Sequence, residues 1–375
     1  MKSLEQKTRE LLALGGITLN GPEPYDLQVF DERMFARVFS SGSMGLGESY
    51  MDGWWDAEKL DELFARALKA RIDTHLKRDP TTILYFLKAR FINWQSKKRA
   101  FQVGEEHYDI GNDLFEKMLD KRMVYTCGYW SSPTTPAKDL DDAQEQKLDL
   151  ICKKIGLKAG DTVLDIGCGW GSFLKFAAEK YGAKGVGITI SKEQAELARE
   201  HCKGLPIEIR IEDYRDTQGQ FDHLVSIGMF EHVGVKNYRE YMKMAARCLK
   251  DDGLFLLHTI GTNESVSGVD PWIHKYIFPN GMLPGPRHIA QAIEKIFVME
   301  DWHCFGTDYD KTTMEWLRRF EEAWPTLKNK YSESFRRMWR FYLCGAAANF
   351  RVRHNQLWQI VLSKKGVKGG YKSVR

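Results

Sequence analysis

The stretch "VLDIGCGWG", residues 163–171, has the composition of a buried strand that turns sharply into a helix. Asp165 lies near the end of the apolar run, and glycines follow at positions 167, 169 and 171. Glycines let the backbone turn tightly and let a ligand approach the main chain without meeting a Cβ atom. The spacing is GxGxG, neither the GxGxxG of dinucleotide sites nor the GxxxxGK[ST] of phosphate loops. The motif therefore favours an adenosyl-amino-acid ligand, whose ammonium group Asp165 can receive.

Short β-branched runs alternate with amphipathic segments on both sides of this motif. We expect strands near 162–167, 185–190, 207–211, 221–227 and 253–260. We expect helices near 171–181, 192–202 and 237–249, and a further one after residue 288. This alternation predicts a parallel sheet with right-handed crossovers. "FVMEDWHCFG", two more helices and "QLWQIVLSK" then predict a closing antiparallel pair, as in Rossmann-like small-molecule methyltransferases. The predicted fold class is α/β, a class I S-adenosylmethionine methyltransferase sheet after a small helical domain.

The length of 375 residues suggests two domains. Residues 1–95 have the pattern of helices separated by turns, and we assign them to a helical N-terminal domain. Residues 96–106, "SKKRAFQVGEE", are polar and basic and are predicted to be a linker. Residues 107–375 form the predicted catalytic domain.

The composition is that of a soluble globular protein, with 43% apolar and 28% charged residues. The longest weakly polar run, 341–350, is too short to span a bilayer, and the N-terminus has no apolar core of a secretory signal. Seven cysteines form no CxxC pair and no zinc-finger spacing with histidine. These features predict reduced thiols in a cytoplasmic protein without a structural metal.

One segment is strongly basic. Between residues 66 and 99, ten Lys or Arg residues accompany only two acidic ones, Asp73 and Asp79. Leu84, Leu87 and other apolar residues can share a helical face there. The segment is either a core-facing helix with a solvated basic side or a surface that meets anionic phospholipid or nucleic acid. Composition alone leaves both interpretations open.

Other residues around the glycine motif are candidates for cofactor binding. The second strand ends in "GITISKEQ" without the usual carboxylate, so Thr189, Ser191 and Gln194 must bind the ribose, or Glu193 must turn inward. The third strand is followed by "EDY", which places two residues where the adenine would lie. The predicted cofactor contacts are Tyr125, Thr126, Asp165, Gly167, Gly169, Trp170, Gly171, Thr189, Ser191, Gln194, Asp213 and Tyr214.

Acidic, imidazole and phenol groups follow the later strands. "SIGMFEHVG" puts Glu231 and His232 after the fourth strand, "LLHTIG" puts His258 at the end of the fifth, and "DYDKT" puts Tyr309 after the sixth. Ligands bind at the carboxyl ends of such strands, so a Glu and a His there can hold a small anion or move a proton. Aromatic residues crowd the same motifs, and "VDPWIHKYIFPNGMLPG" has too much Pro and Gly for a regular element. We interpret it as a lid or pocket wall.

The stretch "MVYTCGYW", residues 123–130, sets Cys127 among three aromatic rings. Cys127 can be a nucleophile, a redox thiol or one wall of an apolar pocket. A sulfonium methyl group is already activated and needs no covalent intermediate. The pocket wall is therefore the favoured interpretation, with Tyr129 and Trp130 beside an apolar channel whose ring faces would stabilise a cation.

These motifs together resemble the bacterial cyclopropane-fatty-acyl-phospholipid synthase family. The resemblance rests on "GLGESYMDGWW", "QSKKRAFQVGEEHYDIGNDLF", "MVYTCGYW", "VLDIGCGWG", "GMFEHVG", "LLHTIG", "VDPWIHKYIFPNG" and "DYDKT" and runs from about residue 35 to the C-terminus. It implies transfer of a methylene group from S-adenosylmethionine to a cis double bond of a phospholipid acyl chain. A bound bicarbonate ion would be the base, held by Cys127, Glu231, His258, Ile260 and Tyr309, with Cys127 and Ile260 contributing mainly main-chain contacts.

The resemblance also implies a homodimer that is peripherally associated with the inner membrane from the cytoplasmic side. The nearest rival function is a C-methyltransferase that leaves a methyl branch on the acyl group. A nucleic-acid or small-metabolite methyltransferase fits the glycine motif, but there is no N/D-PPY-type loop. A non-catalytic membrane-surface protein that uses the basic segment is the third alternative. We expect an unsaturated phospholipid as partner and no nucleic acid.

Overall fold

The computed structural model describes residues 3–75, 111–265 and 268–375. They form two compact units, and neither is continuous in sequence. The helical unit contains residues 3–75, 268–279 and 309–355, and the sheet unit contains 111–265, 280–308 and 356–375. The predicted linker, 96–106, and most of the basic segment lie outside the described residues. The predicted domain boundary there stays a prediction.

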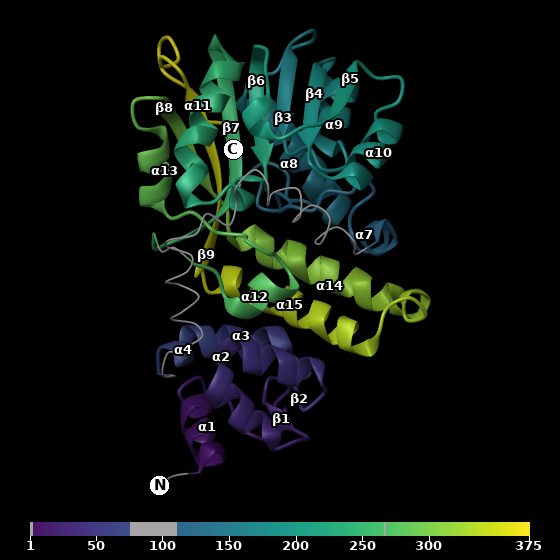
Figure 1. Cartoon of the computed structure of the whole chain (residues 1–375), viewed down its shortest axis with the longest axis vertical. Coiled ribbons are helices and arrows are strands. Elements are labelled where there is room, and N and C mark those ends of the chain that lie inside the picture. The colour runs from purple at the N-terminus through teal and green to yellow at the C-terminus, as the bar shows by residue number, and fades with distance from the viewer. Residues whose placement is uncertain (1–2, 76–110, 266–267) are drawn as a thin grey trace. The chain divides into compact units, whose positions relative to one another are not determined.

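The sheet unit is built on seven strands (Figure 1). These are β3 (Thr162–Ile166), β4 (Lys184–Thr189), β5 (Ile207–Ile211), β6 (Phe221–Ile227), β7 (Leu249–Thr262), β8 (Val298–Cys304) and β9 (Asn355–Ser363). Their order is β5-β4-β3-β6-β7-β9-β8. The first five pair in parallel, and β8 pairs antiparallel with β9. The predicted parallel sheet with a closing antiparallel pair is confirmed.

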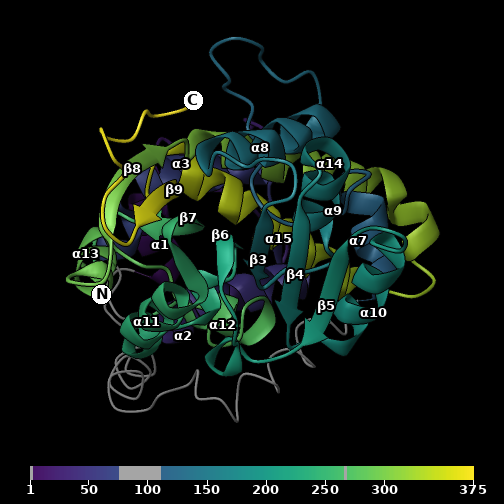
Figure 2. The same cartoon turned by 90° about the horizontal axis from the view of Figure 1, so that it is seen from above.

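Helices cover both faces of this sheet (Figure 2). One face packs against α8 (Leu140–Lys154), α9 (Ser172–Tyr181) and α10 (Lys192–His201). The other packs against α11 (Tyr238–Cys248) and α13 (Pro286–Ile293). A further helix of the unit, α7, spans Asn112–Met118. The two covered faces explain why the strands are nearly continuous runs of apolar residues.

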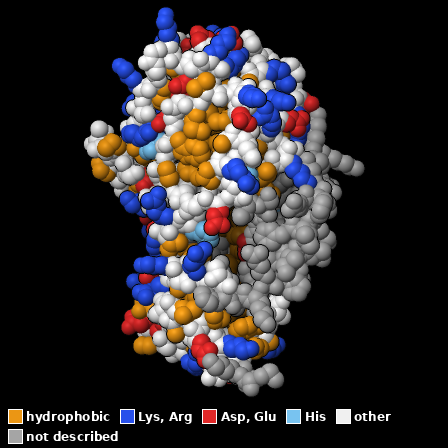
Figure 3. All heavy atoms as spheres, turned by 90° about the vertical axis from the view of Figure 1, so that its left-hand side faces the viewer, with side chains coloured by type: hydrophobic (Ala, Val, Ile, Leu, Met, Phe, Trp, Pro, Cys, Tyr) orange, Lys and Arg blue, Asp and Glu red, His pale blue; other side chains and the backbone are white. Residues whose placement is uncertain are grey.

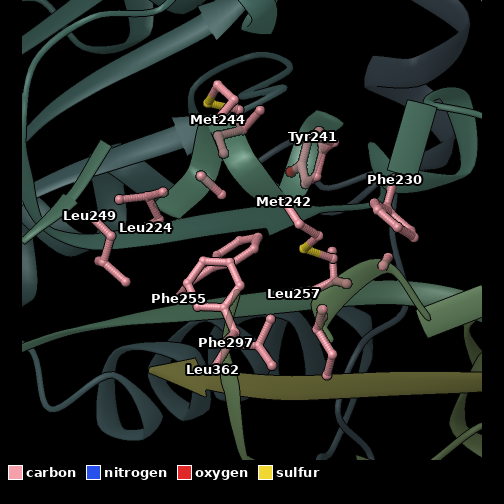
Figure 4. Packing of buried hydrophobic residues seen from close by; sticks show 14 of the residues in the cluster. Leu224, Phe230, Tyr241, Met242, Met244, Leu249, Phe255, Leu257, Phe297 and Leu362 are labelled. Carbon is pink, nitrogen blue, oxygen red and sulfur yellow. The ribbon is translucent and has the colours of Figure 1, made fainter. Parts of the chain in front are cut away.

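The larger core of the sheet unit lies on the α11 side. Its side chains come from the strands, from α11 and from the segment before β8, and they point toward one another (Figure 4). Phe255 and Leu257 of β7 face this core, whereas Leu256 between them faces the α8 side. The alternation follows from the two-residue period of a strand and assigns each of these β7 residues to one face.

β8 ends the strand order at one edge of the sheet. Val298 and Met299 of β8 are partly exposed there. Figure 3 shows apolar side chains gathered on the side of the sheet unit where β8 and α13 lie. Among the described helices, none is both long enough and apolar enough to cross a bilayer.

The helical unit combines early and late parts of the chain. Its helices are α1 (Leu4–Ala13), α2 (Arg33–Met51), α3 (Leu60–Lys69), α4 (Ile72–His75), α12 (Pro271–Tyr276), α14 (from Thr307 to Leu327, entering this unit at residue 309) and α15 (Glu333–Arg351). A short antiparallel ladder joins β1 (Gln28–Val29) to β2 (Trp55–Asp56) and was not predicted. Cys344 and Ala348 of α15 complete the core formed by α1, α2 and α3. The helical character predicted for the N-terminal residues is otherwise present in those described.

The expectation that residues 269–285 contain no regular element is wrong. Residues Pro271–Tyr276 form α12 because Asp270 caps the helix, accepting hydrogen bonds from the main-chain N–H groups of Trp272 (2.9 Å) and Ile273 (3.1 Å). Proline at the first helical position costs no hydrogen bond, since the N–H group there has no partner inside the helix. The proline that suggested irregularity instead begins the helix.

Charged side chains of the helical unit are paired with one another. Glu48 accepts hydrogen bonds from Arg37 (2.6 Å), Lys275 (2.7 Å) and the Tyr276 hydroxyl (2.9 Å). Although burial raises the pKa of Glu48, these bonds bring it down to about 2. Arg351 likewise pairs with two aspartates, Asp61 and Asp310, of the same unit.

Candidate active site in the sheet unit

The glycine loop joins β3 to α9 and has the geometry that its sequence predicts. Gly167, Gly169 and Gly171 have φ values of 84°, 53° and 80°, in the left-handed region that favours glycine. A Cβ atom on Gly167 would lie 2.5 Å from Cγ of Met229, whereas a Cβ on Gly169 would meet nothing within 4 Å among the described residues. The backbone at Gly169 is therefore open to a ligand.

Asp165 of β3 presents an unpaired carboxylate oxygen. Its side chain is buried, and Oδ1 has no hydrogen-bond partner in the described part of the chain. Burial raises the pKa of Asp165 to about 7, although Lys147 lowers it. An orphaned, buried acceptor beside the glycine loop fits the ammonium group of an amino-acid ligand.

Helix α8 holds the segment that contains Thr126 and Cys127. Lys147, fully buried, donates a hydrogen bond to Oγ1 of Thr126 (2.9 Å), and Gln144 donates one to the main-chain oxygen of Thr126 (2.7 Å). The main-chain N–H of Tyr129 donates to the oxygen of Ala143 (2.9 Å). Sequence reasoning missed Gln144 and Lys147. Their signal was two polar residues at helical spacing on the apolar face of α8.

The buried charge of Lys147 interacts with three titratable groups of the sheet unit. Burial lowers its pKa to about 8, and Asp120, Cys127 and Asp165 raise it in part. Asp120 in turn accepts the main-chain N–H groups of Val124 (2.8 Å) and Arg122 (2.9 Å). Lys147 is therefore the cation that stabilises the buried carboxylates under the glycine loop.

The predicted ribose residues lie in the turn from β4 to α10 and bond to one another. Oγ1 of Thr189 donates to Oε1 of Gln194 (2.9 Å) and accepts the N–H of Ser191 (3.2 Å). The side-chain hydroxyl of Ser191 caps α10 by accepting the N–H of Gln194 (3.3 Å). All three are buried at the carboxyl end of β4, next to the glycine loop of β3. Their role toward a ribose stays a prediction.

The remaining predicted cofactor residues differ in their surroundings. Asp213 accepts hydrogen bonds from the Arg215 guanidinium (2.8 Å) and from its main-chain N–H (2.9 Å). Tyr214 is buried in the α11-side core. Tyr125 and Trp170 both contact the ring of Phe115 in α7, with centroids 5.1 and 5.2 Å away. Phe115 therefore joins Tyr125 to the glycine loop, a link that sequence reasoning missed.

Three segments meet beyond the glycine loop. The main-chain N–H of Gly228, after β6, donates to the main-chain oxygen of His258 in β7 (2.9 Å). A Cβ on Gly228 would lie 2.6 Å from Cγ2 of Thr126, so Thr126 packs directly on this turn. The residue after Thr126 is Cys127, and the turn continues into the short helix Phe230–His232. Three predicted site residues, Cys127, Glu231 and His258, thus belong to contacting segments.

Glu231 has one bonded and one unbonded carboxylate oxygen. Oε1 accepts the main-chain N–H of Ile260 (2.7 Å), whereas buried Oε2 has no hydrogen-bond partner among the residues that the structure describes. Burial raises the pKa of Glu231 to about 7, and the hydrogen bond from Ile260 lowers it only in part. Glu231 can therefore change its protonation state near neutral pH.

His258 has a similar asymmetry. Nδ1 lies 3.3 Å from Nε2 of Gln359, whereas buried Nε2 of the imidazole has no hydrogen-bond partner within the described ranges. Burial, together with the charges of Lys147 and Lys154, holds the pKa of His258 well below its usual range. The imidazole is therefore neutral. The neighbouring His232 is also neutral because burial lowers its pKa to about 4.

Cys127 and Tyr309 occupy different units. Cys127 is fully buried in the sheet unit, and its Sγ lies 3.1 Å from the main-chain oxygen of Gly128. Tyr309 belongs to the helical unit, where its ring stacks on Phe350 with centroids 4.5 Å apart. Its predicted contact with a base therefore stays a prediction.

The aromatic residues also divide between the sheet unit and the helical unit. Tyr129 contacts Phe305 (centroids 5.1 Å apart), whose ring lies 6.1 Å from that of His258. Phe230 stacks on Tyr238 and belongs to the α11-side core. The rings from the predicted pocket wall lie in the helical unit: Trp272, Tyr276 and Phe278.

Comparisons with known proteins show the family of the chain. A family model described as mycolic acid cyclopropane synthetase matches residues 95–360. The chain belongs to the mycolic acid cyclopropane synthetase family. It is therefore an enzyme of that family, with the class I S-adenosylmethionine methyltransferase fold.

Individual members of the cyclopropane synthetase family are similar over different lengths. Cyclopropane-fatty-acyl-phospholipid synthase of Escherichia coli (strain K12) is 52% identical over 98% of this chain and 94% of its own length. A probable fatty acid methyltransferase of Pseudomonas putida is 38% identical over 69% of this chain and 68% of its own. The structure of mycolic acid cyclopropane synthase CmaA1 complexed with SAH and CTAB is 29% identical, with a TM-score of 0.65, over 70% of this chain and 98% of its own.

Proposed function

We propose that the protein transfers a methylene group from S-adenosylmethionine to the cis double bond of an unsaturated acyl chain in a membrane phospholipid, forming a cyclopropane ring. The observation that carries the proposal is a pair of buried polar atoms, Oε2 of Glu231 and Nε2 of His258, left without partners by the described residues. Similarity to the E. coli enzyme of that name along 98% of the chain supports the same reaction.

The reaction needs a base but no covalent enzyme intermediate. The alkene attacks the sulfonium methyl carbon, the carbon–sulfur bond breaks, and a carbocation forms on the acyl group. The new methyl group must then lose a proton before the ring closes. Bicarbonate, when bound, would supply the base that accepts this proton.

The protein's own groups fit such an anion. Neutral His258 with a proton on Nε2 donates a hydrogen bond, and the carboxylate of Glu231 accepts one from the hydroxyl of the ion. Ile260 fixes Glu231 through its main-chain N–H, and Cys127 lies in the segment that packs against the same turn. We assign Tyr309 to the same anion by its motif alone.

S-adenosylmethionine would lie along the glycine loop. Asp165 would bind the ammonium group through its unpaired Oδ1, and the open backbone at Gly169 would let the ligand approach. The solved relative bound to SAH, the demethylated form of this donor, supports the assignment. Thr189, Ser191 and Gln194 would receive the ribose. Asp213 and Tyr214 would receive the adenine.

We further propose that the enzyme acts as a homodimer on the surface of the inner membrane, which is where its phospholipid substrate lies. The basic residues in 66–99 are the proposed membrane contact. Reversing the charges of Lys97, Lys98 and Arg99 should weaken activity on anionic vesicles in a salt-dependent way. Unchanged vesicle binding by that variant would contradict the proposed contact.

The deciding experiment is product analysis. Purified protein is incubated with S-adenosylmethionine, bicarbonate and vesicles of an unsaturated phospholipid, and the lipids are examined by mass spectrometry and proton NMR. The proposal expects a gain of about 14 mass units with high-field ring protons, because one CH₂ is added across the alkene. The same mass gain without ring protons would identify a C-methyltransferase, in line with the methyltransferase name of the P. putida relative.

A further inference from the structure

A row of polar side chains crosses three adjacent strands on the α8 face of the sheet. His258 belongs to β7, Gln359 to β9 and His303 to β8, and Gln359 is paired in register with His303. The next residue inward on each of two strands, Leu256 and Val361, packs in the apolar core of this face. The row is therefore a polar line within an otherwise apolar layer.

Gln359 is the least expected member of the row. It is fully buried, and its strand neighbours Trp358 and Ile360 belong to the core on the opposite face. Its Oε1 has no hydrogen-bond partner among the described residues, so the fold bears the cost of a buried, half-satisfied amide. The amide nitrogen, by contrast, contacts Nδ1 of His258.

The contact of the Gln359 amide nitrogen with His258 determines which ring nitrogen of His258 carries the proton. Nε2 of a glutamine can only donate, so Nδ1 of His258, 3.3 Å away, must accept. Because the imidazole is neutral, its single proton is then on Nε2. That is the atom left without a partner by the described residues, and it is the one available to an anion.

Charged groups around the row keep the imidazoles neutral. Lys154 of α8 is buried and places its Nζ 3.0 Å from Nδ1 of His303. Burial and the charges of Lys154 and Arg375 lower the pKa of His303 to about 3. Lys147 and Lys154 act in the same direction on His258. Asp301, whose Oδ2 lies 3.9 Å from Nζ of Lys154, acts on His303 in the opposite direction, and Glu231 bonds to Ile260, two residues after His258.

We infer that Gln359 is a positioning residue for the reaction: its amide donates to Nδ1 of His258 and so holds the imidazole as the Nε2–H tautomer, a hydrogen-bond donor toward the base. The inference rests on the proposed function, because it takes the ligand of Nε2 to be an anion. The reverse amide orientation would place the proton on Nδ1 and leave Nε2 as an acceptor, which repels an anion.

The test compares Gln359→Met with Gln356→Met. Gln356 lies in the same strand and is also buried, but its amide bonds to Asn263 and Cys304 instead of His258. In bicarbonate-depleted buffer, Gln359→Met should raise the bicarbonate concentration needed for half-maximal rate about tenfold, with the KM for S-adenosylmethionine unchanged. Gln356→Met should change neither value by more than about twofold.

A second readout is independent of activity. In protein labelled with ¹⁵N-histidine, the His258 signals, assigned by their loss in His258→Asn, should show an unprotonated Nδ1 and a protonated Nε2. In Gln359→Glu, the carboxylate accepts a hydrogen bond from Nδ1, so the proton of the neutral ring should move to Nδ1 and leave Nε2 without one. That variant should lose at least about tenfold in kcat.

Failure of the proposed function and failure of the positioning role of Gln359 give different results. If the wild-type enzyme forms no cyclopropane lipid, the proposed function fails, yet the NMR measurement still tests the tautomer. If the wild-type enzyme is active and Gln359→Met behaves like Gln356→Met, the positioning role is overturned. A protonated Nδ1 in the wild type would overturn it as well.

Discussion

The pKa values of two glutamates, Glu48 of the helical unit and Glu231 of the sheet unit, shift in opposite directions on folding. Glu48 receives hydrogen bonds from two cations and a phenol, which bring its pKa down to about 2. Glu231 receives a main-chain N–H from Ile260, and its pKa rises to about 7. Burial raises the pKa of both, but Glu231 is much more deeply buried than Glu48, so the difference comes from the extent of burial together with the partners that the fold supplies.

Other side chains of the two units also differ in how fully they are paired. Arg337 and Arg351 of the helical unit are held by carboxylates and carbonyl oxygens of that unit. In the described part of the sheet unit, Asp165, Glu231 and His258 each keep one buried polar atom without a partner. Glu321 of the helical unit also has a buried carboxylate oxygen without a partner among the described residues, so such an atom alone does not mark a ligand site. Asp165, Glu231 and His258 differ because they lie in the glycine-loop strand and in the contacting segments beside it.

The largest expected effect is that of Glu231→Gln on activity. The amide keeps the shape of the side chain but cannot act as a carboxylate toward the base, so kcat should fall about 100-fold or more. Binding of S-adenosylmethionine, measured by calorimetry, should stay within about twofold because Asp165 is unchanged. Activity near the wild-type level would remove Glu231 from the reaction.

The same variant has a predicted effect on stability, with a defined sign. The pKa of Glu231 is raised on folding from 4.5 to about 7, so wild-type stability falls as pH rises through this interval. Gln cannot ionise. The Tm of Glu231→Gln minus that of wild type should therefore be larger at pH 8 than at pH 5. The change corresponds to about 1–3 kcal/mol in the free energy of unfolding. An equal Tm difference at both pH values would contradict the raised pKa.

Asp165→Asn should weaken cofactor binding. It removes the charge that receives the ammonium group, and charge-assisted hydrogen bonds contribute about 1.5–3 kcal/mol, so the Kd for S-adenosylmethionine should rise about 10- to 100-fold. Saturating cofactor should restore most of kcat. A Kd unchanged from wild type would place the ammonium group elsewhere.

Glu48→Gln should destabilise the fold by about 1 kcal/mol at neutral pH, because its partners Arg37 and Lys275 are partly exposed. The folded pKa is below the unfolded value, so this contribution is present above about pH 4.5 and is lost as pH falls toward 2. Thermal unfolding at pH 7 and pH 3 measures it. A Tm difference that grows on acidification would reverse the sign of the shift.

Cys127→Ser should have the smallest effect. The role assigned to Cys127 is a main-chain one, and its thiol is buried against Gly128. Activity should stay within about threefold of wild type, with a small loss of stability from burying a hydroxyl group. Complete inactivation of a folded variant would restore the nucleophile interpretation.

Local periodicity explains which parts of the fold could be predicted. The strands and helices around the glycine loop were predicted to within a few residues because each carries its own period and turn signals. The ladder of β1 and β2 has two residues in each strand, too few for a period. α12 was missed because the frequent Pro and Gly residues of 269–285 were taken to exclude a regular element, although Pro271 begins the helix.

Long-range assembly explains what could not be predicted. α14 and α15 have apolar faces that would suit a sheet or other helices equally well, so their place in the helical unit was not visible. Asp165 lies near the end of β3, Glu231 follows β6, and His258 of β7 pairs with Ile227, the last residue of β6; all three were predicted from a place at or near a strand end. Lys147 and Gln359 lie inside regular elements, where the pattern predicts apolar residues, and only the structure reveals their partners.

The strand order has a consequence for synthesis on the ribosome. β9 lies between β7 and β8 but is translated after both, so β7 and β8 cannot be joined until residues 355–363 have emerged. The core of the helical unit also stays incomplete until α15 has been translated, because residues of α3 and α15 belong to the same core. A nascent polypeptide that stalls before residue 333 therefore carries two open cores and unpaired strand edges, the features that chaperones bind. Neither unit can be produced alone by cutting the gene at a single point.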